Sequence, residues 1–200
     1  MAKEFELKYQ ASPEILEEIQ GNFSDFTPIS METTYFDTPD GAMKARRWTL
    51  RRRLENGTAV CSLKTPGDFI RRGEWEAEGE DILALLPALC QLGAPEELLS
   101  LTASGISPVC GARFTRLAAR IQLEAGEVEL ALDQGVFLGG GRQVPFAEVE
   151  VELKEGTEEA ALAFAGALAE RFHLTPETRG KVERAMALGE SAVDGGGFIV

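Results

Sequence analysis

The sequence predicts an α+β protein in which an antiparallel β-sheet closes into a barrel and helices pack outside it. Charged and apolar residues alternate along several strand candidates, as they do in strands with one polar and one apolar face. Asn56-Gly57 separates two of these candidates and is a strong signal for a hairpin. With 200 residues, of which 44% are hydrophobic and 26% charged, the chain is long enough for one domain with a sizeable core.

Helix signals stand between the strand candidates. Ser12 is the expected N-cap of a helix that starts at Pro13, and Thr157 is the expected N-cap of an alanine-rich helix that ends near Phe172. Further helices are expected at residues 81–91, 95–101 and 178–188. Strands are expected at residues 3–9, 33–37, 49–54, 59–64, 74–78, 113–120, 121–124, 127–133 and 147–153.

The overall charge argues against nucleic-acid and membrane partners. Twenty Lys and Arg residues against 33 Asp and Glu residues give a formal net charge of −13, so a surface adapted to polyanions is not expected. The cysteines Cys61, Cys90 and Cys110 are odd in number and far apart, which argues against a disulfide framework or a zinc site. Reduced thiols predict a cytoplasmic protein.

Acidic residues share one face of the strand candidate at residues 147–153. Glu148, Glu150 and Glu152 alternate with apolar residues, and three stacked carboxylates repel each other unless a cation lies against them. We therefore expect Glu150→Gln to leave the empty protein as stable as the wild type or slightly more stable. A second alternation, Glu-Phe-Glu-Leu-Lys, occupies residues 4–8.

Basic residues gather in one segment, against the overall charge balance. Arg51 and Arg53 share a face, Lys64 joins them one hairpin later, and Glu74 and Glu76 share a face of the next strand. If these faces all point into the barrel, its interior has basic and acidic walls. Such an interior suits a polyphosphate that Mg²⁺ or Mn²⁺ bridges to carboxylates.

These residues resemble the motifs of the CYTH domain family, also called triphosphate tunnel metalloenzymes. The similarity covers about residues 2–188, and one segment, residues 132–135, is most similar to the bacterial inorganic triphosphatase branch. Gly180 departs from the family, which usually has a small hydroxyl residue there. The matching segments, in chain order, are Glu4-x-Glu6-x-Lys8, Tyr35-Phe36-Asp37-Thr38-Pro39, Leu50-Arg51-Arg52-Arg53, Leu63-Lys64, Arg72-Gly73-Glu74, Leu132-Asp133-Gln134-Gly135, Glu148 to Glu152, and Lys181.

The resemblance implies an eight-stranded antiparallel tunnel with helices outside, which binds a small anionic triphosphate and Mg²⁺ or Mn²⁺. It implies that phosphate oxygens are bound by Lys8, Arg51, Arg53, Lys64, Arg116 and Lys181. It implies that the metal is held by Glu4, Glu6, Glu148, Glu150 and Glu152. The implied catalytic residues are Glu4, Glu6, Lys8 and Glu150, and the further candidates are Glu74, Glu76, Asp133 and Arg113, the last as an alternative to Arg116.

The implied activity is metal-dependent hydrolysis of inorganic tripolyphosphate to pyrophosphate and phosphate. Adenylate cyclase and thiamine triphosphatase activities on the same fold, and a polyphosphate-binding module without catalysis, are the alternatives. We expect a tunnel domain at residues 1–188 and a flexible glycine-rich tail at residues 189–200. Many bacterial triphosphatases of this branch continue into a histidine-rich helical domain, so a stand-alone or excised catalytic domain is expected, with a homodimer left open.

Overall fold

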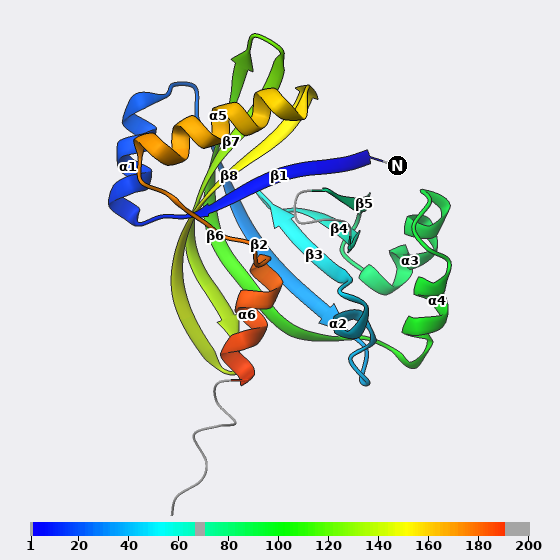
Figure 1. The fold of residues 1–200 in the computed structure, drawn as a ribbon. Helices are drawn as coiled ribbons and strands as arrows, with labels where there is room; N and C mark the ends of the chain where they lie inside the picture. The colour runs from blue at the N-terminus through cyan, green and yellow to red at the C-terminus, as the bar shows by residue number, and fades with distance from the viewer. Residues whose placement is uncertain (1, 67–70, 191–200) are drawn as a thin grey trace, which may run out of the picture.

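One antiparallel sheet forms the centre of the molecule (Figure 1). The computed structural model describes residues 2–66 and 71–190, with side chains at 5–66 and 73–189. The sheet has the strand order β5-β4-β3-β2-β6-β7-β8-β1-β9. Its strands are β1 (Ala2–Gln10), β2 (Thr27–Asp37), β3 (Thr49–Glu55), β4 (Thr58–Thr65), β5 (Arg71–Glu78), β6 (Ser107–Leu123), β7 (Gly126–Gly139), β8 (Arg142–Gly156) and β9 (Thr175–Pro176).

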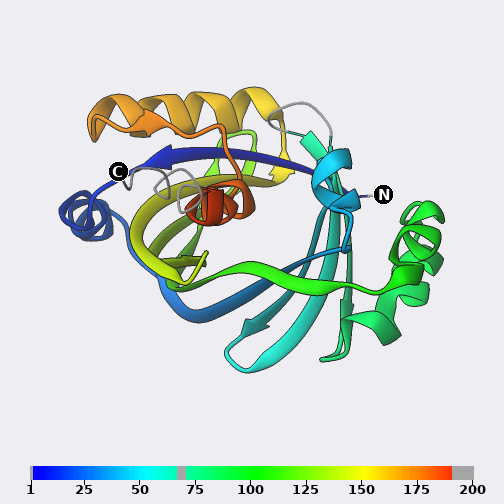
Figure 2. The same cartoon turned by 90° about the horizontal axis from the view of Figure 1, so that it is seen from below.

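Strand β1 connects the two ends of the strand order. It pairs with β5 from Ala2 to Phe5 and with β8 from Glu6 to Gln10. The sheet is therefore an approximate barrel of eight strands, and Figure 2 shows how it curves. A ninth strand that we did not predict, β9, adds two residues beside the end of β1.

Helices cover the outer face of this barrel in two places (Figures 1 and 2). The helices are α1 (Pro13–Asn22), α2 (Ala42–Arg46), α3 (Ile82–Gln91), α4 (Glu97–Leu101), α5 (Glu158–Arg171) and α6 (Lys181–Glu190), with a 3-10 turn at Thr102–Ser104. Phe5, Val149 and Val151 of the sheet are buried with Ile19 of α1 and Leu168 of α5. The apolar sides of β1 and β8 thus face outward, which leaves their charged sides facing the interior.

The last helix, α6, lies within the curve of the sheet rather than outside it (Figure 2). Its apolar residues Val182 and Ala185 pack against Phe114, Phe137 and Phe146, which stand on the inner faces of β6, β7 and β8. The expectation that all helices lie outside is corrected at this point. The cause is a patch of aromatic residues at one end of the barrel interior that needs an apolar cover.

The strands differ from the predicted ones mainly in length. β6 is one strand of 17 residues where we expected two, because its pairing with β7 runs without interruption from Gly111 to Leu123. The short helix α2 was not predicted. Its first turn is held by the buried carboxylate of Asp37, which accepts hydrogen bonds from the backbone N–H groups of Met43 and Lys44 at 2.8 and 3.1 Å.

α6 reaches Glu190, two residues beyond the predicted helix end, and the rest of the expected tail lies outside the described residues. The three cysteines are free, as predicted. Across the described chain, no helix is both long and apolar enough to cross a membrane.

Candidate functional site: a charged cavity inside the sheet

The interior of the barrel holds a cavity of about 310 Å³, which we call the charged cavity. Pockets for small ligands usually measure about 300 to 1,000 Å³, so this one suits a compact ligand. Its basic lining residues are Lys8, Arg51, Arg53, Lys64, Arg116, Lys154 and Lys181. Its acidic lining residues are Glu6, Glu55, Glu74, Glu76, Glu129, Glu150 and Glu152. Among the described side chains, the two signs are equal in number.

Cross-strand register brings the predicted residues together. Lys8 lies opposite Glu150, Glu6 lies opposite Glu152, and Lys64 lies opposite Glu74. Residues opposite each other on one face of an antiparallel pair have Cβ atoms about 4.5 to 5.5 Å apart. The alternation read from the sequence therefore places acidic and basic side chains of four strands in one space.

One wall of the charged cavity consists of β3, β4 and β5. Arg51 contacts Glu74 at 3.1 Å and Glu76 at 3.8 Å, and Lys64 contacts Glu74 at 3.2 Å. Arg53 pairs with Glu55 and lies 3.7 Å from Glu76. Burial lowers the pKa of Arg53, and the positive charge of Arg51 acts in the same direction. An anionic ligand here would relieve this crowding of cations.

The opposite wall ends in a buried carboxylate cluster formed by Asp133, Glu148 and Glu150. Arg116 donates two hydrogen bonds of 2.8 Å to Asp133 and also pairs with Glu150. The ammonium of Lys181 lies 2.9 Å from Asp133 and 2.5 Å from Glu150, and it pairs with Glu148 as well. The predicted row of carboxylates is therefore compensated by cations, which removes the basis for expecting Glu150→Gln to stabilise the empty protein.

Burial and pairing shift the pKa values in this cluster. Burial disfavours the charged forms of Lys181 and Glu150, but their opposite charges outweigh it, so the pKa of Lys181 rises well above its usual range and that of Glu150 falls well below. For Glu148, burial raises the pKa to about 7 against the opposing charge of Lys181. The cluster thus keeps Lys181 and Glu150 charged at neutral pH.

The remaining candidate residues differ in how they lie relative to the cavity. Arg116, the preferred arginine, lines the charged cavity, whereas Arg113 lies opposite Val136 and is exposed. Glu148 and Asp133 are fully buried beside Glu150 and do not line the cavity. The side chain of Glu4 lies outside the described residues.

The sequence analysis missed four residues at or behind the cavity. Glu129 and Lys154 extend the charged alternations of β7 and β8, and their period of two could have identified them. Glu55 follows Arg53 by two residues on the same face. Arg184 pairs with Glu148 from α6, three residues after Lys181, and its partner could not be read from the chain because α6 was expected outside the barrel.

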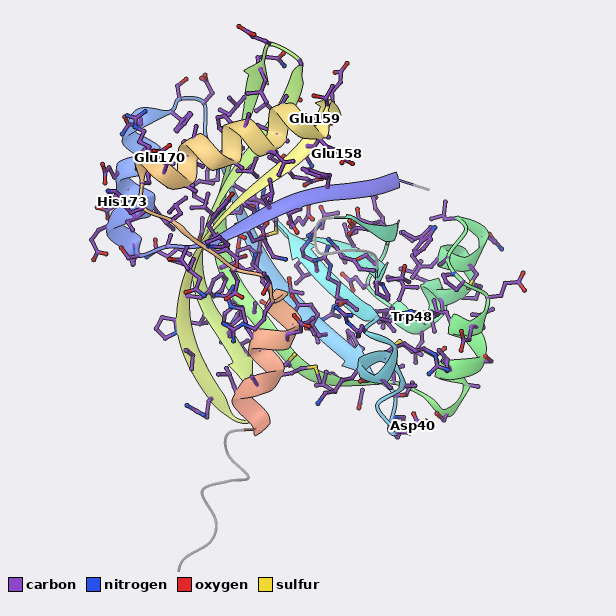
Figure 3. All side chains as sticks on the ribbon, viewed as in Figure 1. Asp40, Trp48, Glu158, Glu159, Glu170 and His173 are labelled. Carbon is purple, nitrogen blue, oxygen red and sulfur yellow. The ribbon has the colours of Figure 1, made fainter. Side chains whose placement is uncertain are left out.

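A second cavity of about 550 Å³ adjoins the first, and the two share Lys8, Tyr35, Thr49, Lys64, Gly180 and Val182. Its other lining residues are more varied and combine aromatic, aliphatic and charged side chains: Phe36, Asp37, Met43, Lys44, Arg47, Trp48, Leu50, Thr65, Pro66, Val109, Thr178, Arg179, Glu183 and Met186. Trp48 lies beside α2 (Figure 3). The structure places Trp48 at this cavity.

His173 follows α5 and lies beside α1, away from the barrel interior (Figure 3). Its φ of 53° is the left-handed conformation common just after a helix end. The only histidine of the chain therefore belongs to a helix terminus.

An approximate antiparallel barrel whose charged interior contains Arg116 and five basic residues of the sequence motifs defines a protein of the triphosphate tunnel class. The chain belongs to the CYTH domain family, whose match covers residues 2–186. The inorganic triphosphatase of Haemophilus influenzae is 27% identical over 198 residues, which are 94% of this chain and 56% of that protein. The chain thus spans about half the length of this relative.

Solved structures share the fold. A Bacillus halodurans protein suggested to be an adenylate cyclase is 24% identical, with a TM-score of 0.64 over 92% of this chain and 98% of the other. A Hippeastrum protein, suggested to be an adenylyl cyclase and found to have a dominant triphosphatase activity, is 19% identical, with a TM-score of 0.66 over 96% of each chain. At these identities the likeness concerns the fold alone.

Proposed function

We propose that the protein hydrolyses inorganic tripolyphosphate to pyrophosphate and phosphate with the help of a divalent metal ion. The observation that supports this most is the charged cavity itself, in which Arg116 and five basic residues of the family motifs lie close to carboxylates. The similarity to the Haemophilus influenzae inorganic triphosphatase supports the same substrate. Cytoplasmic location stays a prediction.

The basic residues would bind the phosphate chain. Arg51, Arg53 and Lys64 lie on one wall, Lys8 and Arg116 on the other, so a linear triphosphate between them would receive charge-assisted hydrogen bonds from both sides. Each cation is now paired with a carboxylate, as Arg51 is with Glu74, so phosphate oxygens would replace carboxylate oxygens as partners. Phosphoryl transfer depends mainly on such positioning and charge neutralisation.

Carboxylates on the cavity surface fit a divalent metal by their chemistry. Glu6, Glu150 and Glu152 all line the charged cavity, and carboxylate oxygens are the ligands that Mg²⁺ and Mn²⁺ prefer. When bound there, the metal would neutralise phosphate oxygens and lower the pKa of a coordinated water. Among the other expected metal ligands, Glu148 faces Lys181 and Arg184 instead of the cavity.

A water molecule would attack the terminal phosphorus in line with the departing pyrophosphate. The chain's part in this step is to align the substrate between the walls and to stabilise the negative charge that develops on the leaving oxygens. Arg53 and Arg116, both partly buried, are placed to supply that charge. No covalent bond to the protein is needed.

Organic triphosphates are the second candidate substrates, and the second cavity favours them. It adjoins the charged cavity at Lys8, Tyr35 and Lys64 and exposes Trp48 and Phe36 near cationic side chains. A ring attached to the last phosphate could pack against such a surface. The adenylate cyclase and thiamine triphosphatase alternatives both need a place of this kind.

Phosphate release from tripolyphosphate, ATP and thiamine triphosphate, with Mg²⁺, with Mn²⁺ and with a chelator, tests the proposal. We expect release from tripolyphosphate that stops when the metal is removed. Binding of tripolyphosphate without release of phosphate would instead identify a binding module, and formation of cyclic AMP from ATP would identify a cyclase.

A further inference from the structure

The two cavities differ in their charge. The charged cavity has as many carboxylates as basic groups among its described side chains, whereas basic groups outnumber carboxylates in the second cavity. We infer that the second cavity is the entrance through which the phosphate chain reaches the charged cavity, and that Arg47 at its rim attracts the chain. The inference rests on the proposed function in taking tripolyphosphate as the ligand. The charged residues that line the second cavity are the basic Lys8, Lys44, Arg47, Lys64 and Arg179 and the acidic Asp37 and Glu183.

Both carboxylates of the second cavity accept hydrogen bonds from backbone N–H groups. Asp37 accepts three such bonds, at 2.7, 2.8 and 3.1 Å, and Glu183 accepts one from Gly180 at 2.7 Å. The N–H dipoles oppose the negative charges of these two side chains. The basic side chains therefore determine the sign of the electrostatic potential in this cavity.

The second cavity lies at one particular end of the barrel. Because neighbouring strands are antiparallel, β1, β2 and β4 all finish at the same end. Lys8, Tyr35 and Lys64 stand near the ends of these three strands, and all three line the second cavity. Figure 1 shows α2 at this end, toward which β2 points, and the hairpin between β6 and β7 at the other.

The opposite end of the charged cavity is mainly acidic. Glu55 is the last residue of β3, and Glu129, near the start of β7, lies opposite Glu152. Lys154 accompanies these three carboxylates and pairs with Glu152 at 2.7 Å. The whole chain carries a formal net charge of −13, so most of its surface repels a polyphosphate as well. An approaching anion is therefore attracted to the end with the second cavity.

The passage between the two cavities is itself basic. Lys8 from β1 and Lys64 from β4 line both cavities, so they stand where one cavity opens into the other. Arg51, which follows on the inner face of β3, lines only the charged cavity. A phosphate group that leaves the second cavity thus meets two ammonium groups before it reaches the first arginine.

Arg47 is the basic residue at the rim. It is exposed, and among the residues that the structure describes it has no carboxylate partner. Its φ of 58° at the end of α2 is a left-handed conformation that glycine adopts at lower cost, so the fold accepts strain to place a basic side chain there. Its neighbour Arg46 lines neither cavity and pairs with Glu97 at 2.7 Å.

The association rate constant of tripolyphosphate tests this inference, because a charge at an entrance changes association more than dissociation. Calorimetry gives the dissociation constant and phosphorus NMR line shapes give the dissociation rate constant, both with a chelator present so that no turnover occurs. Arg47→Gln should lower the association rate constant at least about threefold at low ionic strength. The difference should disappear in 1 M salt, where the Debye length is about 3 Å.

Arg46→Gln is the matched control, because it removes the same charge from the next residue, outside both cavities. Its association rate constant should stay within about 1.5-fold of the wild type at low ionic strength. Equal losses in the two variants would mean that only net charge matters and would overturn the inference. An unchanged association rate constant in Arg47→Gln, or a change confined to dissociation, would overturn it too.

A second variant obstructs the entrance. Val109 lines the second cavity and is 41% exposed, so the fold can accommodate a larger side chain at this position. Val109→Trp should slow both association and dissociation at least about threefold and leave the dissociation constant within about twofold, because one passage serves both directions. Unchanged rate constants would mean that the chain enters elsewhere.

These measurements also separate the inference from the proposed function. A protein that binds tripolyphosphate through this entrance but releases no phosphate when Mg²⁺ or Mn²⁺ is added would refute the proposed hydrolysis and leave the inference standing. A protein that binds no tripolyphosphate would refute both.

Discussion

Replacing Glu150 with Gln should destabilise the empty protein. The change preserves the shape of the side chain but removes a charge that Lys181 and Arg116 share at buried sites. Removing one partner of a buried ion pair lowers the free energy of unfolding by about 3 to 5 kcal/mol. Both cations keep Asp133 as a partner, so we place the loss near the lower end, at about 3 kcal/mol.

Thermal unfolding of the metal-free protein at neutral pH, followed by circular dichroism, measures this loss. For a chain of this size, 1 kcal/mol corresponds to about 2 to 4 °C, so the melting temperature should fall by about 6 to 12 °C. Glu76→Gln is the control, because Glu76 is 42% exposed and lies 3.7 and 3.8 Å from its two arginines. The Glu76→Gln change should lower the free energy of unfolding by less than about 1 kcal/mol.

A Glu150→Gln protein that melts within about 2 °C of the wild type, or above it, would contradict this reasoning. That result would mean that repulsion along the row of glutamates outweighs the ion pairs.

The other predictions concern pH, catalysis and specificity. Hydrogen bonds from Arg179 are the main cause that lowers the pKa of Glu177 to about 2 from an ordinary 4.5, so its stabilising contribution is complete above pH 4.5 and is lost as the pH falls from 4.5 to 2. Because Arg179 is 59% exposed, we expect this pair to contribute about 1 kcal/mol to the free energy of unfolding measured with denaturant, and Glu177→Gln should remove this acid-dependent part. Arg53→Ala should lower kcat/KM for tripolyphosphate more than about tenfold, and unchanged phosphate release would exclude its role. Trp48→Ala should leave the binding of both tripolyphosphate and ATP within about twofold by calorimetry; weaker binding of ATP alone would assign the second cavity to the organic half of a triphosphate.

The alternation of charged and apolar residues in the sequence predicted which strand faces line the interior. Glu148, Glu150 and Glu152 had to share a face because the side chains of a strand alternate with a period of two, and β1 and β8 bury their apolar sides under α1 and α5. The hairpin at Asn56-Gly57 likewise fixed Arg51 and Lys64 on one side. These relations are local, so the sequence contains them.

The ion pairs of the cluster are not local. Lys181 meets Glu148 across 33 residues because α6 enters the barrel, and it does so to cover Phe114, Phe137 and Phe146. Strand patterns show that these rings face inward but not which element covers them. The sequence therefore predicted which residues face the interior and missed which of them neutralise each other.

Steady-state phosphate release from tripolyphosphate and from ATP, under the same metal conditions, tests the central proposal most directly. If the charged cavity binds only the phosphate chain, the nucleoside adds bulk without matching contacts. A misfitting group costs about 2 to 3 kcal/mol, so kcat/KM for tripolyphosphate should exceed that for ATP by roughly 10². Equal or higher efficiency with ATP would contradict the account and assign the second cavity to the organic half of the true substrate.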